Sequence, residues 1–250
     1  MAGHNKWSKI KHRKAVVDKR RGKVWTKVSK AIIVAAKNGG PDPDSNLSLR
    51  YAIDEARYAN MPRDTIERAI KKGAGGEDQS NYETVRYEGY GPGGVAVIID
   101  TLTDNRARTV GDLRLAFSDH SGNLGTTGCV GYLFQPRGVI VVETPGKTED
   151  QMMELALEIN AADAQSSGDE DHPQWTIITS VEDFNAAKAA IDKSDLKITE
   201  ANLAMVPDST VEIRGENAQT LINLIDAIED LDDVQKVYSN AFVPDDEIRE

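Results

Sequence analysis

The chain opens with MAGHNKWSKIKHRKAVVDKRRGKVWTKVSKAIIVAAK, Met1 to Lys37, and the rest of the protein is organised around this stretch. It holds twelve of the 30 Lys and Arg residues and a single acid, Asp18, so its formal charge is +11. The other 213 residues hold 18 bases and 40 acids and carry −22, which brings the whole chain to −11. A basic segment attached to an acidic body is typical of an arm that binds a partner.

Residues 1–22 have almost no apolar periodicity and are predicted to be a mobile tail, followed by a helical domain that ends near residue 80. Apolar residues recur at helical spacing from Lys23, and a second helix is predicted over Asn46–Ala59. Asn60 is expected to be a left-handed cap, and Pro62 fits the first turn of a third helix. The stretch GAGGEDQSN, Gly73–Asn81, has the composition of a flexible linker.

Strands begin after this linker. The turn Gly89–Gly94 leads into an apolar run, Val95–Asp100, which predicts a hairpin and a buried strand. The turn is not predicted to be a phosphate loop, because it lacks the Lys-Ser/Thr pair and precedes a strand. Asp104 is expected to N-cap a helix. Further strands are predicted over Cys129–Phe134 and Val234–Val243.

Residues 138–206 read as β-α-β-α-β, with a weak further strand near Ala164, which is the ferredoxin-like order. Thr148 and Gln151 form a predicted capping box within it. The segments that precede and follow this region together form one complete α/β layer if the region is inserted between them. We therefore predict an α+β fold with a helical N-terminal domain and two α/β domains, the ferredoxin-like one inserted into the middle one. The predicted domains are 1–80, 81–134 plus 208–250, and 135–207.

Five blocks in this order resemble the YebC family, which includes the mitochondrial translational activator of cytochrome oxidase subunit one. The blocks are GHNKWSKIKHRK (Gly3–Lys14), ANMPRDTIERAIKKG (Ala59–Gly73), YEGYGPGGVAVI (Tyr87–Ile98), TDNRARTVGDLR (Thr103–Arg114) and GNLGTTGCVGYLF (Gly122–Phe134). The resemblance spans essentially the whole chain. It implies a helical domain plus two α/β domains, and a non-enzymatic regulator of gene expression, either a DNA-binding transcriptional regulator or a ribosome-associated translation factor.

The basic arm is the predicted nucleic-acid-binding site. Its cations neutralise phosphates and release counterions, and six to ten such contacts give strong, salt-dependent binding. An aromatic ring and an imidazole within it are suited to stacking on unpaired bases. The candidate residues are Lys6, Trp7, Lys9, Lys11, His12, Arg13, Lys14, Lys19, Arg20, Arg21 and Lys23. Secondary contacts are expected from Lys71, Lys72, Arg106 and Arg108.

The expected partner is ribosomal RNA, the ribosome or promoter DNA. Arginine- and lysine-rich arms order on structured RNA, and the acidic body would be repelled by a long duplex beside it, so RNA is slightly favoured. DNA stays open, because a helical domain with the basic residues Lys71 and Lys72 could straddle a duplex, although no recognition helix with base-reading residues is evident.

Composition also restricts the compartment in which the protein is expected and the kinds of site that it can contain. No apolar run approaches 18 residues and no secretory leader is evident, so no membrane span is expected. The single cysteine, Cys129, fits a reducing compartment and excludes a Cys-based zinc site, so we expect a cytoplasmic protein. No cofactor, metal, catalytic residue or small-molecule substrate is predicted.

Two alternative functions stay open at this point. Asp100 and Asp104, with Glu88, are carboxylates suited to holding Mg²⁺ for a nuclease reaction. The ferredoxin-like region is alternatively a protein-interaction scaffold to which the arm is incidental.

Overall fold

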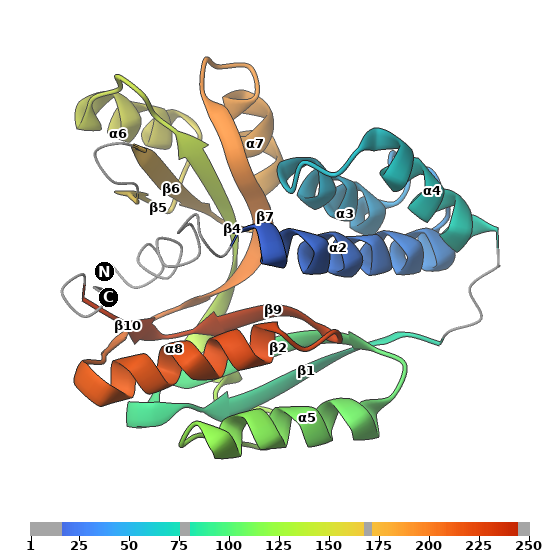
Figure 1. Ribbon diagram of the computed structural model, residues 1–250. Helices are drawn as coiled ribbons and strands as arrows, with labels where there is room; N and C mark the ends of the chain where they lie inside the picture. Colours follow the sequence, from blue (N-terminus) through green and yellow to red (C-terminus); the bar gives the residue numbers. More distant parts are fainter. Residues whose placement is uncertain (1–16, 76–80, 168–171, 245–250) are drawn as a thin grey trace. The chain divides into compact units, whose positions relative to one another are not determined.

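The structure is a computed structural model that describes residues 17–75, 81–167 and 172–244, with side chains given from residue 22 onwards (Figure 1). Internal contacts divide the chain into two compact units. Among the described residues, one unit holds 17–131 and 215–239, and the other holds 132–214 and 240–244. The α+β fold class is confirmed, and the three-domain division stays a prediction. No helix in the described ranges is long and apolar enough to cross a membrane.

The first unit begins with three helices that share one apolar core. They are α2 (Val17–Gly39), α3 (Leu47–Tyr58) and α4 (Arg63–Ala74). Ile32, Leu49 and Ala56 are completely buried between them. The helix predicted from Lys23 therefore exists but begins earlier, so that it reaches back into the basic arm.

The helix ends follow the predicted capping chemistry with one correction. The side chain of Asn46 N-caps α3 by accepting the N–H of Leu49 at 3.1 Å. Asn60 has a φ of 54°, as predicted for a left-handed cap. Pro62 was expected in the first turn of α4, but it occupies the N-cap position with an extended backbone.

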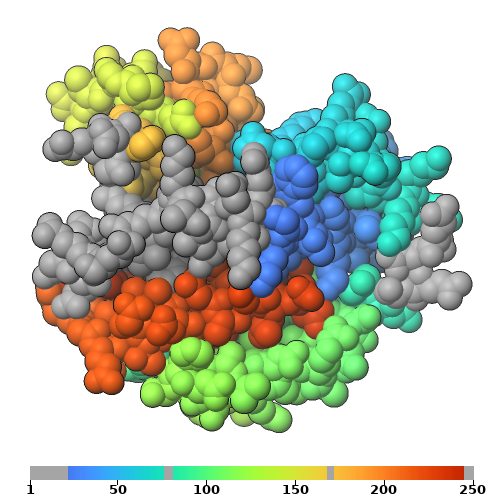
Figure 2. All heavy atoms as spheres, in the orientation of Figure 1, coloured from blue at the N-terminus to red at the C-terminus, as the bar shows by residue number. Residues whose placement is uncertain are grey.

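A four-stranded sheet and two helices complete the first unit. They are β1 (Glu83–Tyr90), β2 (Ala96–Thr103), α5 (Arg106–Asp119), β3 (Asn123–Leu124), α8 (Gly215–Glu229) and β9 (Val234–Ser239). The strand order is β3-β1-β2-β9, and every neighbouring pair is antiparallel. Helices α5 and α8 contact each other, and their outer faces lie at the surface in Figure 2. Phe117 and Leu221 are buried on their inner faces.

The predicted hairpin is confirmed. Strands β1 and β2 pair from Glu83 opposite Thr103 to Tyr90 opposite Ala96. A short 3₁₀ turn, η2 (Pro92–Gly94), joins them. Gly93 and Gly94 both have positive φ, at 68° and 77°, so this turn requires residues without a β-carbon.

The prediction of a strand over Cys129–Phe134 is wrong except at its last residue. Residues 131–133 form the 3₁₀ turn η3 (Gly131–Leu133), and a strand begins only at Phe134. The cause is Glu88 on β1, which is 5% exposed. Its carboxylate accepts three backbone N–H groups at 2.7–2.9 Å, from Gly128, Val130 and Gly131. These backbone N–H groups, which would pair with a neighbouring strand if the segment were extended, are hydrogen-bonded to the Glu88 side chain instead.

Two smaller predictions are also wrong. Helix α5 is N-capped by Asn105, whose side chain accepts the N–H of Arg108 at 3.1 Å, and not by Asp104. The continuous strand predicted over Val234–Val243 is broken at Asn240 into β9 and β10 (Ala241–Phe242), which belong to different sheets.

The second unit contains the ferredoxin-like order predicted from the sequence, including the weak strand. It comprises β4 (Phe134–Glu143), α6 (Glu149–Glu158), β5 (Asp163–Ser166), β6 (Gln174–Thr179), α7 (Phe184–Ile191) and β7 (Lys197–Pro207). The sheet order is β5-β6-β4-β7, and all pairs are antiparallel. The capping box of Thr148 and Gln151 at the start of α6 is confirmed. Strand β8 (Val211–Glu212) pairs in parallel with β10.

The contacts of Glu88 give a test of this fold. Glu88→Gln replaces one acceptor oxygen with a donor, so at least one buried N–H loses its partner, and we expect unfolding to become easier by about 1–3 kcal/mol. Urea unfolding followed by circular dichroism measures the change. Glu83→Gln, on the same strand, removes an exposed ion pair with Arg106 and should cost at most about 1 kcal/mol. Equal losses in the two variants would contradict the assigned role of Glu88.

Candidate nucleic-acid interface

Most of the predicted arm lies outside the described residues. This applies to Lys6, Trp7, Lys9, Lys11, His12, Arg13 and Lys14. Lys19, Arg20 and Arg21 lie in the first turns of α2, although their side chains are not described. The backbone of α2 thus continues directly from the arm into the helical core.

Two lysines of α2 contact the end of α8. The ammonium of Lys23 lies 2.9 Å from a carboxylate oxygen of Asp230, and Lys27 donates to the carbonyl of Glu229 at 2.6 Å. The last carbonyls of a helix lack partners within it and carry partial negative charge, so lysines there are favourable. Lys23 was predicted to contact phosphate, and the structure shows it paired within the chain.

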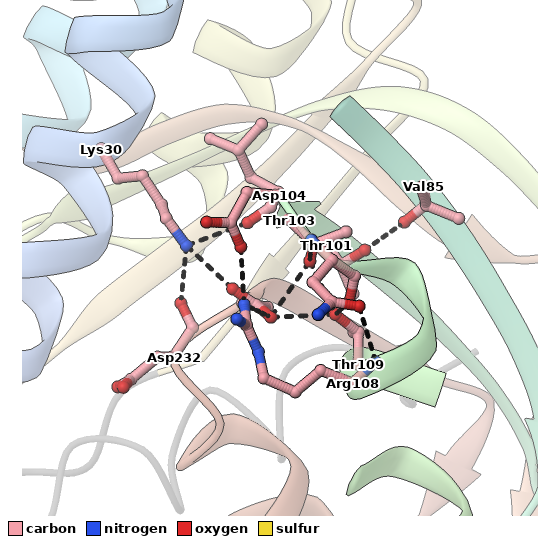
Figure 3. Close-up of polar contacts among 11 residues, drawn as sticks. Lys30, Val85, Thr101, Thr103, Asp104, Arg108, Thr109 and Asp232 are labelled. Atoms are coloured by element: carbon pink, nitrogen blue, oxygen red, sulfur yellow. Dashed lines mark hydrogen bonds and ion pairs between the residues drawn. The ribbon is translucent and has the colours of Figure 1, made fainter. Parts of the chain in front are cut away.

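A third lysine of α2, Lys30, enters a polar cluster around the carboxylate of Asp233, and Figure 3 shows this cluster with Lys30, Thr103, Arg108 and Thr109 labelled. Asp233 lies in the turn between α8 and β9, and its side chain is 8% exposed. One carboxylate oxygen accepts a hydrogen bond from Lys30 at 3.0 Å. The other accepts from Arg108 at 2.7 Å and from the hydroxyls of Thr103 and Thr109 at 3.1 and 2.9 Å. Helix α2, strand β2 and helix α5 are therefore joined at one carboxylate.

The contacts of the cluster favour the charged forms of Asp233 and Arg108. Burial by itself raises the pKa of Asp233, but hydrogen bonds from Arg108, Lys30 and Thr109 outweigh it and lower the pKa to about 2. The pKa of Arg108 is raised because its guanidinium donates to Asp233 and to Asp104. Lys30 also donates to the carbonyl of Leu102 at 3.0 Å.

The predicted secondary contacts divide into two groups. Arg106 and Arg108 are each paired with carboxylates, Arg106 with Glu83 and Arg108 as described above. Lys71 and Lys72 lie exposed in the last turn of α4. Arg106 and Arg108 thus contact carboxylates of their own unit, and the two lysines lie on the surface of the helical region. Contacts of these four residues with nucleic acid stay a prediction.

The carboxylates of the nuclease hypothesis are each held by a different partner. Asp100 accepts two hydrogen bonds from Arg86, at 2.7 and 2.9 Å, and Asp104 accepts one from Arg108 at 2.8 Å. Glu88 is bound by backbone N–H groups, which lower its pKa despite the opposing effect of burial. Within the described ranges, no three potential metal ligands gather at one point. These contacts do not favour a metal-dependent nuclease.

The sequence interpretation missed Asp233 as the centre of the cluster. Its partners Thr103 and Thr109 are 130 and 124 residues away, so no local pattern reports the contact. The available signal is the TDNRARTVG block itself, in which polar residues directly follow the buried strand that ends at Thr103.

The pKa of Asp233 predicts how stability changes with pH. Asp233→Asn at neutral pH should lower the free energy of unfolding by about 2 kcal/mol, because the folded-state pKa lies well below the unfolded value. This stabilisation is present above the unfolded pKa of 3.8 and is lost as the pH falls towards about 2. Urea unfolding at several pH values should show the two proteins converging below about pH 4.

Asp230→Asn is the matched control, since Asp230 lies at the end of the same helix and pairs with α2 through Lys23. That ion pair is exposed, with 41% and 66% of the two side chains accessible, so the cost should be at most about 1 kcal/mol. A wild-type advantage over Asp233→Asn that did not change between pH 7 and pH 3 would contradict the role of Asp233.

Comparisons with known proteins agree with the resemblance seen in the sequence. The N-terminal domain of TACO1/YebC proteins matches residues 5–76, and their second and third domain matches residues 82–241. A probable transcriptional regulatory protein of Idiomarina loihiensis is 51% identical over 246 residues, which cover 98% of this chain and 97% of the relative. A probable transcriptional regulatory protein of Desulforapulum autotrophicum is 46% identical over 246 residues, which cover 98% of this chain and 98% of the relative.

A solved structure is also similar. The crystal structure of a conserved hypothetical protein from Aquifex aeolicus superimposes with a TM-score of 0.85 at 45% sequence identity. The match covers 96% of this chain and 98% of that one. Because both domain matches and full-length relatives agree, the chain belongs to the TACO1/YebC family.

Proposed function

We propose that this protein is a cytoplasmic, non-enzymatic regulator of gene expression that binds nucleic acid through its basic N-terminal arm. The observation that carries the proposal is the separation of charge, with +11 in residues 1–37 and −22 in the rest. An arm of this charge neutralises several phosphates at once and releases their counterions. The names of the relatives, probable transcriptional regulatory proteins, support a regulatory role.

The contacts of the described cations support the arm as the main phosphate-binding element. Arg86, Arg106 and Arg108 lie against carboxylates of their own unit, and Lys23 lies against Asp230. The surface around them therefore presents little net positive charge. A phosphate backbone is attracted most strongly to the first 22 residues, which hold eight Lys and Arg and one acid.

RNA is the preferred partner in this proposal, with ribosomal RNA as the leading candidate and promoter DNA as the second. A long DNA duplex lying beside a body of charge −22 is repelled along much of its length. A folded RNA accepts a short arm locally, and basic segments commonly order on such targets.

The salt dependence of binding tests the arm. Replacing Lys19, Arg20 and Arg21 with Gln should make the slope of log affinity against log salt shallower by about 2 on an RNA stem–loop and by about 3 on a DNA duplex, since each phosphate contact contributes about 0.7 on single strands and about 0.9 on a duplex. Gln has nearly the same helix propensity as Lys and Arg, so α2 should persist. Fluorescence anisotropy with a labelled RNA stem–loop, repeated with a DNA duplex, measures the slopes.

A triple variant in the helical region removes the same charge elsewhere. Arg57→Gln, Arg63→Gln and Arg68→Gln each break an exposed pair within α3 or α4. We expect this control to keep the wild-type slope. Equal slopes for all three proteins, or no affinity of the wild type for either polynucleotide at low salt, would reject the proposed function.

A further inference from the structure

A pocket of about 470 Å³ lies within the first unit, beside the N-terminal half of α2. Its walls include Trp25, Ser29 and Lys30 of α2, Lys72 of α4, and Tyr82 just before β1. Ligand pockets in proteins usually measure about 300–1,000 Å³, so this one has room for a small organic group. None of the contacts described above assigns it a role.

Both aromatic side chains of the pocket are held in place by contacts that do not depend on a ligand. The indole N–H of Trp25 donates to the carbonyl of Ala59 at 2.9 Å, and the ring packs against the helical core. The ammonium of Lys30 lies 4.8 Å from the centre of the Tyr82 ring. Because Lys30 is itself bonded to Asp233, the tyrosine is positioned by the polar cluster.

The pocket is lined by cations in a protein that is acidic overall. Within the part of the chain that the structure describes, no carboxylate is among its lining residues, although the whole chain holds 41 Asp and Glu. Two of the lining residues are lysines. Only 18% of the Lys30 side chain is accessible, whereas Lys72 is exposed, so Lys72 is the better placed of the two to meet an anion.

The position of the pocket along α2 relates it to the basic arm. Arg21 precedes Trp25 by four residues, or about 6 Å along the helix axis. If Arg21 binds a phosphate, as in the proposed function, that phosphate lies about one helical turn from the aromatic walls along α2. Aromatic rings beside cations are the usual means of binding unpaired bases.

We propose that this pocket receives one unpaired nucleotide of the bound strand. Its base stacks against Tyr82 or Trp25, and its phosphate pairs with Lys72. The inference rests on the proposed function, because it takes the bound polymer to be nucleic acid. It adds that the protein distinguishes looped or single-stranded segments from continuous duplex.

Fluorescence anisotropy with the full-length protein tests this. The probes are a labelled RNA hairpin with an eight-nucleotide unpaired loop and a perfectly paired RNA duplex of the same length. Tyr82→Ala should weaken binding of the hairpin about tenfold, the effect typical of losing one stacked base, and change duplex binding less than twofold. Tyr82→Phe keeps the ring and should bind both probes like the wild type.

A second variant acts by filling the space. Ser29→Leu leaves both rings in place but occupies part of the pocket, and it should reduce hairpin affinity without reducing duplex affinity. Thermal unfolding of each variant checks that the fold is retained. A deoxyribose version of the hairpin shows whether the sugar is also distinguished.

The outcomes separate this inference from the proposal on which it rests. If the wild type binds the hairpin and both pocket variants bind it equally well, or if they lose hairpin and duplex affinity together, the pocket assignment is overturned. If the wild type binds no probe at low salt, the proposed function fails and the pocket assignment fails with it.

Discussion

The carboxylate of Asp233 is the contact on which the first unit depends. It accepts hydrogen bonds from Lys30 on α2, from Arg108 and Thr109 on α5, and from Thr103 at the end of β2. One buried anion thus joins the helix that continues the basic arm to the α/β sheet. The same lysine positions Tyr82, so the cluster also shapes the pocket beside α2. A buried ion fixes the positions of the donors around it, because removing one of these donors leaves part of the buried charge without a partner.

The distribution of charge gives this anchored helix its function in our account. The basic residues of the described surface lie largely against acids of their own unit, whereas residues 1–22 combine eight bases with one acid. In the proposed function, the acidic body limits how much of a polynucleotide can approach, and the arm supplies the attraction. This division of charge would favour a local, folded site over a long, uniform duplex.

Local sequence signals predicted most of the fold. The Gly-rich turn between β1 and β2, the capping box before α6 and the left-handed Asn60 each depend on neighbouring residues, and all three are confirmed. The failures have non-local causes. Glu88 binds N–H groups 40 to 43 residues away, which turns an expected strand into a loop, and Asp233 acts on partners more than 100 residues distant. Neither the pattern of strands and helices, nor the family resemblance, nor composition identified the pocket, whose walls come from three separate segments.

The central claim is that the arm contacts nucleic acid in the living cell. Ultraviolet crosslinking in cells, followed by identification of the nucleotide-bearing peptides and sequencing of the attached strands, measures this directly. We predict crosslinked peptides from residues 1–23, attached mainly to structured RNA. Crosslinks confined to residues 132–214, or recovery no higher than that of a protein lacking residues 1–22, would contradict the account.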